Sequence, residues 1–478
     1  MANAQRLPAS ILLRIFELSI EAQDPFPAPK YDVLRVITHA YPEWRRVALA
    51  QASLWTHIQL PPIRFQHPEN LVGLFQQHVD RSADLPLSIE LQTDVRAQLP
   101  GGDTANVVED YLYGGGAISI IDTILLPICE RLVSLTCLLC GADIVCFLHL
   151  LSGTFPALER VSITFIHTLD TPRSPFTGSL VDCLNFTVFE NHKALKEATF
   201  NILNEIHPLD LKLLWTIITK LDLGQNPVSP LLFLRIMRRV SPSLIEGSFQ
   251  IEFPRVSARP LHHRYCDVLM PHLTTLRLKL TNPSVDTSFF FYLRAPGLEI
   301  LRIEKYDDYA GWEVSMFDPF LMHFTRTLRV LELADFSPKA PGYAPPVRKS
   351  SQTRIYQDLE SLFAILPHLE VLRLPSSIQI RMPMIEKLAN GLLLPLLIEL
   401  ELYAVDPEQV LWMMKERNFL SGYCQLQPGS SRRASEVASQ MNVKSFRLVK
   451  VWVDDCEVEL SSSVRVGMEF GWRVASGI

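Results

Sequence analysis

The sequence predicts an α/β chain: a helical unit at the N-terminus, followed by an irregular solenoid of repeats whose strands form a parallel sheet. Two observations predict this fold. In residues 1–60, apolar side chains recur at the spacing of amphipathic helices. From residue 129 onward, the pattern changes to short apolar triplets that recur along the chain, as the strands of stacked repeats do.

Composition and charge exclude several classes of function. The chain has 478 residues, 48% hydrophobic and 20% charged, so it can bury a large core. Its net charge of -6 leaves no positive excess to neutralise phosphates, and we expect no nucleic-acid partner. The most apolar stretch, residues 118–135, is interrupted by Asp122, Pro127 and Glu130, so we expect no membrane contact. The N-terminus lacks the features of a secretory signal, which predicts a cytoplasmic and/or nuclear protein.

The first predicted helix lies in residues 7–20, LPASILLRIFELSI. Its apolar side chains fall on one helical face, Pro8 breaks the chain before it, and Ser10 is expected to be the N-cap. Residues 21–31, EAQDPFPAPKY, hold three prolines, which predict an extended connection instead of a continued helix.

The second predicted helix begins near Pro42 and runs to about residue 51. Trp44, Val47 and Ala48 share one face of it, and Leu54 and Trp55 follow directly. The predicted order is therefore helix, loop, helix and then Ser-Leu-Trp.

About 50 residues are marginal for a self-sufficient core, so this many large apolar side chains suggest contacts beyond the unit. Either the rest of the chain covers them, or another protein does. Burial of Phe16, Trp44 and Trp55 within the isolated chain favours the first explanation, whereas an exposed apolar patch favours the second.

The order and spacing of these features resemble the F-box, in the form that is abundant in mushroom-forming fungi. The resemblance covers residues 7 to about 60 and continues through residues 70–91, where a helix, a polar turn and a strand are expected. The chain departs from the family pattern at Tyr41, Pro42 and Glu43, where a small and a basic residue are usual. The matching residues are Leu7, Pro8, Ile11, Leu12, Ile15, Phe16, Trp44, Arg45, Ala48, Leu54 and Trp55.

The resemblance implies a substrate-recognition subunit and not an enzyme, with no catalytic residue, metal or cofactor of its own. In the family, the F-box packs on the Skp adaptor of a cullin-RING ubiquitin ligase, and the rest of the chain captures a protein substrate. The residues expected to bind the adaptor are Leu7, Pro8, Ile11, Leu12, Ile15, Phe16, Trp44, Val47, Ala48, Leu54 and Trp55.

The later part of the chain carries the apolar triplets. Most begin about 23 to 30 residues apart, and several follow a lead-in such as FPAL, APGL or LPHL. From the second group on, the residue between the last two apolar positions is polar, as expected for strands with one buried face. The groups are Leu132 and Leu135, then Leu158, Val161 and Ile163, Leu195, Ala198 and Phe200, Ile218, Leu221 and Leu223, Leu273, Leu276 and Leu278, Leu298, Leu301 and Ile303, Leu328, Leu331 and Leu333, Leu369, Leu372 and Leu374, and Leu397, Leu400 and Leu402.

This stretch resembles an irregular leucine-rich-repeat domain, which implies a substrate-binding outward strand face. An ordinary solvated strand face explains any single outward residue equally well. Regular repeats place Asn or Cys after the last apolar position, a pattern that only Cys140 and Asn226 clearly match. The outward residues expected to face a substrate are Asp222, Arg277, Arg302, Glu332, Arg373 and Glu401.

Three alternatives stay open. Two concern the function: a repeat scaffold that binds a partner without a ligase role, and an enzyme with an unrecognised site. The third concerns the fold, which could be a chain of unrelated α/β layers. The predicted domain limits are 1–62 for the F-box, 63–128 for a connecting helix and strand segment, 129–410 for the repeats, and 411–478 for a C-terminal cap with a polar Ser-rich linker.

One cluster of cysteines contains part of a metal-binding pattern. Cys129, Cys137, Cys140 and Cys146 include one CxxC, but no second ligand pair follows at zinc-finger spacing. We therefore expect no bound metal.

Overall fold

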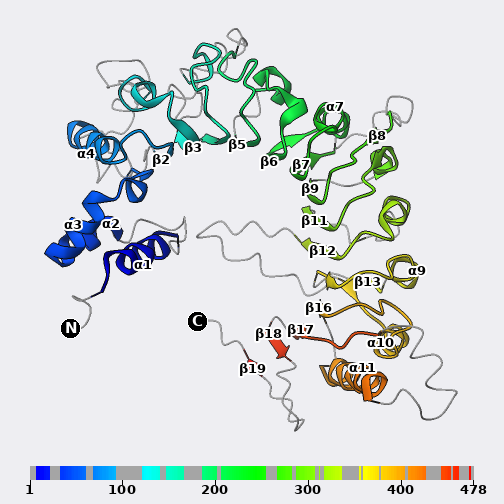
Figure 1. Cartoon of the computed structure of the whole chain (residues 1–478). Helices are drawn as coiled ribbons and strands as arrows, with labels where there is room; N and C mark the ends of the chain where they lie inside the picture. Colours follow the sequence, from blue (N-terminus) through cyan, green and yellow to red (C-terminus); the bar gives the residue numbers. More distant parts are fainter. Residues whose placement is uncertain are drawn as a thin grey trace, which may run out of the picture. The chain divides into compact units, whose positions relative to one another are not determined.

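The computed structural model is a mixed α/β structure with mostly parallel strands (Figure 1). The chain divides into two compact units, Met1–Ile218 (unit 1) and Thr219–Ile478 (unit 2). The mixture of helices and mostly parallel strands confirms the predicted α/β class. The residues whose structure is described are 7–21, 33–60, 68–92, 121–139, 147–165, 186–201, 206–253, 266–281, 287–306, 312, 317–335, 355–356, 359–375, 378–403, 407–426, 443–453, 456–461 and 473–474.

Unit 1 begins with the helices α1 (Ala9–Glu21), α2 (Val33–Ala40) and α3 (Pro42–Ala50) and the short helix η2 (Ala52–Trp55). The backbone carbonyl of Pro8 accepts hydrogen bonds from the N–H groups of Ile11 and Leu12, at 3.0 and 3.1 Å. Pro8 therefore precedes the helix, and Ser10 lies inside its first turn. The expectation that Ser10 is the N-cap is wrong, because the N-cap is the residue whose carbonyl accepts the first helical bond.

A break at Tyr41 separates α2 from α3. Tyr41 has φ -148° and ψ 143°, and Pro42 follows it at the first position of α3. A residue before proline is driven out of the helical region, so α2 ends at Ala40 and a new helix starts at the proline. The predicted order of helix, loop, helix omitted α2. Of the predicted extended connection, residues 22–31 lie outside the described part of the chain.

The remaining elements of unit 1 build a parallel sheet. Its strands pair in chain order, each parallel to the next. The helix, polar turn and strand expected over residues 70–91 are confirmed as α4, a turn after Arg81, and β2. The elements are β1 (His57–Gln59), α4 (Pro68–Arg81), β2 (Leu87–Gln92), η4 (Ile121–Leu125), η5 (Leu126–Ile128), β3 (Leu132–Leu139), β4 (Arg160–Phe165), β5 (Glu197–Asn201), η8 (Pro208–Leu211) and η9 (Trp215–Ile217).

Unit 2 continues with eight strands that pair in parallel. They follow the order β6, β7, β9, β11, β12, β14, β16 and β17. Their bounds are Lys220–Val228, Glu246–Glu252, Thr275–Thr281, Ile300–Tyr306, Val330–Asp335, Val371–Arg373, Glu399–Tyr403 and Leu448–Val453. Two antiparallel strands, β18 (Cys456–Ser461) and β19 (Arg473–Val474), follow β17.

The helices α7, α9, α10 and α11 of unit 2 lie on one side of this strand row (Figure 1). Two short parallel pairs, β8 with β10 and β13 with β15, complete the described strands. The remaining bounds are α7 (Pro230–Val240), β8 (Val268–Leu269), η10 (Thr287–Tyr292), β10 (Leu293–Arg294), α8 (Asp318–Leu321), η12 (Met322–Phe324), β13 (Ile355–Tyr356), α9 (Glu360–Ala364), β15 (Ile378–Gln379), α10 (Met382–Ala389) and α11 (Pro407–Leu426).

The predicted apolar triplets line the buried face of the strands. Every residue of those triplets is buried, with at most 4% of its surface exposed. In unit 2 the middle positions are also in register from strand to strand. They form a continuous row, which we call the leucine ladder, of Leu276, Leu301, Leu331, Leu372, Leu400 and Val449.

The proline-containing lead-ins form turns that enter the strands. In FPAL, the N–H of Leu158 donates to the carbonyl of Phe155, at 3.2 Å. APGL and LPHL show the same bond, from Leu298 to the carbonyl of Ala295 at 3.0 Å and from Leu369 to that of Leu366 at 3.2 Å. Proline fits the second position of such a turn because its φ is already fixed near the required value. The lead-in therefore sets where each strand begins.

The strand β7 was missed by the triplet pattern. Its middle apolar position is Gly247, where an added Cβ would lie 2.8 Å from a ring carbon of Phe249. The other two positions, Leu244 and Phe249, are buried as in the other strands. A glycine is needed here because the large ring of Phe249 fills the space. The lead-in SPSL, which ends at Leu244, was the signal that could have located this strand.

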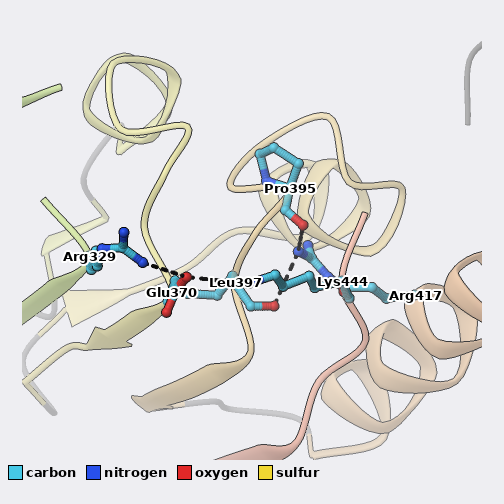
Figure 2. A network of polar contacts seen from close by, with 6 residues as sticks. All are labelled: Arg329, Glu370, Pro395, Leu397, Arg417 and Lys444. Carbon is cyan, nitrogen blue, oxygen red and sulfur yellow. Dashed lines mark hydrogen bonds and ion pairs between the residues drawn. The ribbon is translucent and has the colours of Figure 1, made fainter. Parts of the chain in front are cut away.

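A buried arginine fixes the C-terminal part of unit 2. Arg417 on α11 has no exposed surface, and its guanidinium donates to the backbone carbonyls of five described residues. Burial lowers the pKa of Arg417 to about 10, so the side chain stays protonated at neutral pH. Figure 2 shows its contacts with the carbonyls of Pro395 and Leu397. The guanidinium carbon also lies 4.7 Å from the ring centre of Phe446. The accepting carbonyls belong to Leu388 (2.7 Å), Leu394 (2.6 Å), Pro395 (2.9 Å), Leu397 (3.3 Å) and Lys444 (2.9 Å).

One of these carbonyls belongs to a strained turn. Leu394 has φ 48°, in the left-handed region where a side chain costs about 1 kcal/mol or more. Its carbonyl points at Arg417, which thus helps to hold the turn that leads into β16. The same guanidinium joins α10, this turn and the segment before β17, so one side chain connects three parts of the chain.

The leucine ladder predicts an asymmetry between the two faces of β12. Leu331→Ala removes a fully buried side chain and should lower the free energy of unfolding by about 3 kcal/mol. Val330→Ala, next to it but on the half-buried outward face, should lower it by less than half as much. Urea denaturation of the full chain measures both values. Equal effects from the two changes would contradict the assignment of the buried face.

Arg417→Met should lower the free energy of unfolding by about 3 kcal/mol or more, because it leaves several buried carbonyls without a donor. Arg417→Lys, which keeps the charge but has fewer donors, should fall in between. Lys415→Met, an exposed position of the same helix, is the control and should change little. A melting temperature of Arg417→Met equal to that of the wild type would show that the network contributes nothing.

Candidate protein-binding surfaces

The helices α1, α2 and α3 share a small core of their own. Leu34 and Ile37 of α2 complete it, although neither was predicted as a site residue. Of the eleven residues expected to bind an adaptor, Leu7 and Trp44 are partly buried against this core, and Pro8, Ile11 and Ile15 are exposed. The other six form the core itself: Leu12, Phe16, Val47, Ala48, Leu54 and Trp55.

The two tryptophans have different surroundings. The ring N–H of Trp55 donates to the carbonyl of Ala48, at 2.8 Å, and His78 contacts the ring edge-on at 4.9 Å. The guanidinium of Arg81 lies over the same ring, 4.4 Å from its centre. Trp55 therefore ties the helices to α4 and is 2% exposed. Trp44 packs edge-on against Phe16, at 5.6 Å, and keeps part of its surface exposed.

An apolar strip runs along the outer face of α1. Ile11, Ile15 and Leu18 are 47%, 42% and 47% exposed, and their spacing places them on one face of the helix. The core residues Leu12 and Phe16 lie on the neighbouring face, which packs into the helical core. Leu18 was not predicted, although the same periodicity points to it. Three exposed aliphatic residues in a row form the kind of patch that marks a protein contact.

A row of polar residues crosses the outward face of the unit 2 strands. Asp222, Arg277, Arg302, Glu332, Arg373 and Glu401, all predicted from sequence, occupy equivalent register positions on successive strands. The structure adds two residues at this register position: Ser248 of β7, between Asp222 and Arg277, and Lys450 of β17, beside Glu401. We call this row the charged row. The structure thus brings together residues that span most of unit 2 in sequence.

Ion pairs connect the later members of the charged row. Glu332 forms ion pairs with both neighbours, and its side chain is 14% exposed. Arg302 Nη1 lies 3.4 Å from it on one side, and Arg373 donates a hydrogen bond to it on the other. Arg373 Nε also lies 3.7 Å from Glu401. Arg302 Nε lies 2.8 Å from Glu304, without the alignment of a hydrogen bond. Glu332 is therefore shared by two arginines, and each of these arginines also lies beside a second carboxylate.

The first member of the row has a local role. One carboxylate oxygen of Asp222 accepts a hydrogen bond from the N–H of Gly224, at 2.7 Å. An added Cβ at Gly224 would lie 2.9 Å from that oxygen, so the glycine allows the carboxylate to turn back on its own backbone. The carboxylate of Asp222 thus makes a local hydrogen bond that stabilises the end of the regular part of β6.

An apolar row lies directly beside the charged row. Ile300, Val330 and Val371 are in register with one another and precede Arg302, Glu332 and Arg373 by two residues, on the same face. Ile300 is 38% exposed, and the two valines are half-buried. The centre of the face therefore offers aliphatic and charged contacts side by side.

The equivalent row of unit 1 is chemically different. Gln59, Glu90, Thr136, Ser162 and Thr199 are in register on successive strands, so hydroxyl groups replace most of the charges. At this register position, charge is therefore concentrated in unit 2.

A second set of ion pairs lies at the entry of the unit 2 strands (Figure 2). Glu370 accepts from Arg329 Nη1 and from Lys444 Nζ, both at 3.3 Å. Lys444 is also the residue whose carbonyl Arg417 binds. These pairs join the turns before β12, β14 and β17, which is a structural role.

The cysteine cluster gives no metal site in the described residues. Cys129 is half-buried and Cys137 is buried, while Cys140 and Cys146 lie outside the described ranges. In the part of the chain that the structure describes, no three His, Cys, Asp or Glu side chains are placed to hold an ion. None of the described helices has the length and apolar character needed to cross a membrane.

Comparison with known proteins gives no family. No protein-family model matches this chain, and no curated protein matches its sequence. The functional argument therefore rests on the surfaces of the molecule itself.

The shared position of Glu332 yields a prediction. Glu332→Gln removes the charge between two arginines and should lower the free energy of unfolding by about 1 kcal/mol, less in high salt because screening weakens the pairs. Glu43→Gln breaks the exposed pair with Arg46 on α3 and is the control, with little expected change. Urea denaturation at low and high salt tests both. A loss that is the same at both salt concentrations would contradict an ionic origin.

Proposed function

We propose that this chain is the substrate-recognition subunit of a Skp–cullin–F-box ubiquitin ligase. In this proposal the helices α1 to α3 are an F-box that docks on the Skp adaptor, and the later strands are an irregular leucine-rich-repeat solenoid that holds a protein substrate. The chain does no covalent chemistry and needs no cofactor. It acts in the cytosol or nucleus by raising the concentration of a target near a ubiquitin-charged enzyme.

The observation that carries the proposal is the exposed apolar strip of α1. Ile11, Ile15 and Leu18 lie outside the helical core, so no contact of that core requires them to be apolar. Burying three such side chains at an interface removes apolar surface from water and is favourable. Ile11 and Ile15 are also residues that match the F-box pattern. The strip therefore supplies a docking face, whereas Phe16 and Trp55 hold its helices together.

The proposed repeat solenoid is supported by the regular pattern of buried and outward residues along the strands. The leucine ladder is buried, the outward positions are polar, and lead-in turns recur at the strand entries. Leucine-rich repeats stack in this way, with each repeat burying the face of its neighbour. The outward face is then left available for a partner.

A second function has its own supporting observation. Phe16 and Trp55 are buried, and Trp55 is packed against α4. This burial favours helices that cap the repeats of a protein-binding scaffold without a ligase role. In that case the strip on α1 has no adaptor to bind, so the two functions differ in one measurable contact.

Ile15→Asp should abolish binding to the Skp adaptor, because a carboxylate would be buried in an apolar interface. We expect wild-type affinity in the submicromolar range and a loss of about 100-fold or more in the variant. Isothermal titration of the purified full chain with the adaptor measures this. Ile15 is exposed in the free chain, so the variant should keep the wild-type melting temperature.

Leu74→Asp is the matched control, since Leu74 is an exposed aliphatic residue on α4, outside the strip. It should bind the adaptor as the wild type does. No adaptor binding by the folded wild type would reject the ligase function and leave the scaffold as the better account. Equal binding by Ile15→Asp and the wild type would place the interface elsewhere.

A further inference from the structure

The outward face of β9, β11, β12 and β14 carries more positive than negative charge. Along the charged row these four strands carry three arginines and one glutamate, and Glu401 of the neighbouring strand β16 adds a second glutamate. In the next row, Lys279 and Glu304 are opposite each other in register and balance. The whole chain has a net charge of -6, so this local excess has the opposite sign to the protein.

Arg277 is the source of the excess. Its side chain is exposed, and among the residues with described structure it has no ion pair. Its register neighbours are Ser248 on one side and Arg302 on the other. Like charges opposite each other on neighbouring strands are unfavourable, so this pair of arginines is stabilised when an anion binds.

The later arginines also keep unused donors. Each guanidinium has five N–H groups, and the side chains of Arg302 and Arg373 are still 41% and 45% exposed while paired with Glu332. Glu332 is 14% exposed and already shared by both, so it cannot serve Arg277 as well. The intramolecular pairs thus fix the planes of these two arginines and leave part of each facing outward.

The apolar row provides the second element of recognition. Ile300, Val330 and Val371 run parallel to the charged row, with Ile300 the most exposed. A ligand that reaches the arginines must pass beside these side chains. The face therefore suits a segment in which acidic and aliphatic side chains alternate, because both kinds of contact are then made at once.

We propose that this face binds an acidic, aliphatic segment of a partner protein, whose carboxylates pair with Arg277 and Arg302 while an aliphatic side chain packs on Ile300 and Val330. Carboxylate–arginine pairs supply orientation and specificity, and the apolar contact supplies affinity. The inference rests on the proposed function in one respect: it names the class of substrate that the same sheet face would hold. It holds equally for a scaffold without a ligase role.

The test uses the full chain and fluorescein-labelled peptides in anisotropy titrations. The probe is three repeats of Glu-Leu-Asp-Val. Comparison peptides replace the acidic residues with Lys and Arg, replace the aliphatic residues with Ser, or replace Glu with phosphoserine. The protein variants are Arg277→Glu and, as matched control, Arg239→Glu, an equal charge change at an exposed position of α7. Circular dichroism melts confirm that both variants are folded.

We expect saturable binding of the acidic, aliphatic probe, weakened about tenfold or more by Arg277→Glu, weakened by added salt, and unchanged by Arg239→Glu. The basic peptide should not bind, and the Ser-substituted peptide should bind more weakly. No saturable binding by folded wild type, or equal binding by Arg277→Glu, would overturn the inference. Binding only of the phosphoserine peptide would also overturn it, in favour of a phosphorylated partner.

The adaptor titration on the same preparations separates the two proposals. Retained peptide binding without adaptor binding would reject the ligase function alone. Retained adaptor binding without peptide binding would reject the acidic partner alone.

Discussion

The in-register pairing of the unit 2 strands is the constraint on which the rest of that unit depends. Because each strand pairs with the next at the same repeat position, the leucine ladder forms one continuous buried row. A slip of one residue would turn every leucine outward and bury the charged row, at a large cost in desolvation. The same pairing that builds the core therefore assembles the outward face.

The charged row follows from this register. Arg302, Glu332 and Arg373 are far apart in the sequence, and each pairs with the next only because their strands are aligned. Ion pairs of partly exposed groups add little stability individually. Their larger effect here is to hold two arginines in fixed orientations next to Arg277, on a face with an adjacent apolar row. Organised charge of this kind gives a binding surface its specificity.

The end of the unit uses a different solution. Arg417 satisfies backbone carbonyls from α10, from the strained turn at Leu394 and from the segment before β17. A buried cation is expensive to desolvate, and its hydrogen bonds to these carbonyls must offset that cost. This arrangement requires all three segments to be in place together. Arg417 therefore couples the last parallel strands to the helices behind them.

Much of this organisation could be predicted from the sequence. The apolar triplets gave the buried positions and the outward row, because strand period and repeat spacing are local properties of the chain. The strand β7 was not predicted because Gly247 occupies a position where the pattern requires a larger apolar residue. Only packing against Phe249 explains that glycine. The role of Arg417 was not predicted because its partners are backbone carbonyls, which every residue carries. The helix α2 was omitted because it spans only eight residues between the proline-rich connection and Pro42.

The division of the N-terminal residues into core and surface could not be predicted. Phe16 and Ile15 are adjacent in sequence and equally apolar, yet one is buried and the other is 42% exposed. Only the positions of α2 and α3 decide which side of α1 is covered. The buried residues let the helical unit fold, whereas the exposed ones give it a surface for docking. The proposed function depends on this division.

The most direct measurement is hydrogen–deuterium exchange of the full chain with and without the Skp adaptor. The account predicts that the amides of α1 become strongly protected when the adaptor is added, while those of β9 to β14 keep their exchange rates. Unchanged exchange in α1 at saturating adaptor would contradict the claim that the strip of Ile11, Ile15 and Leu18 is a docking surface.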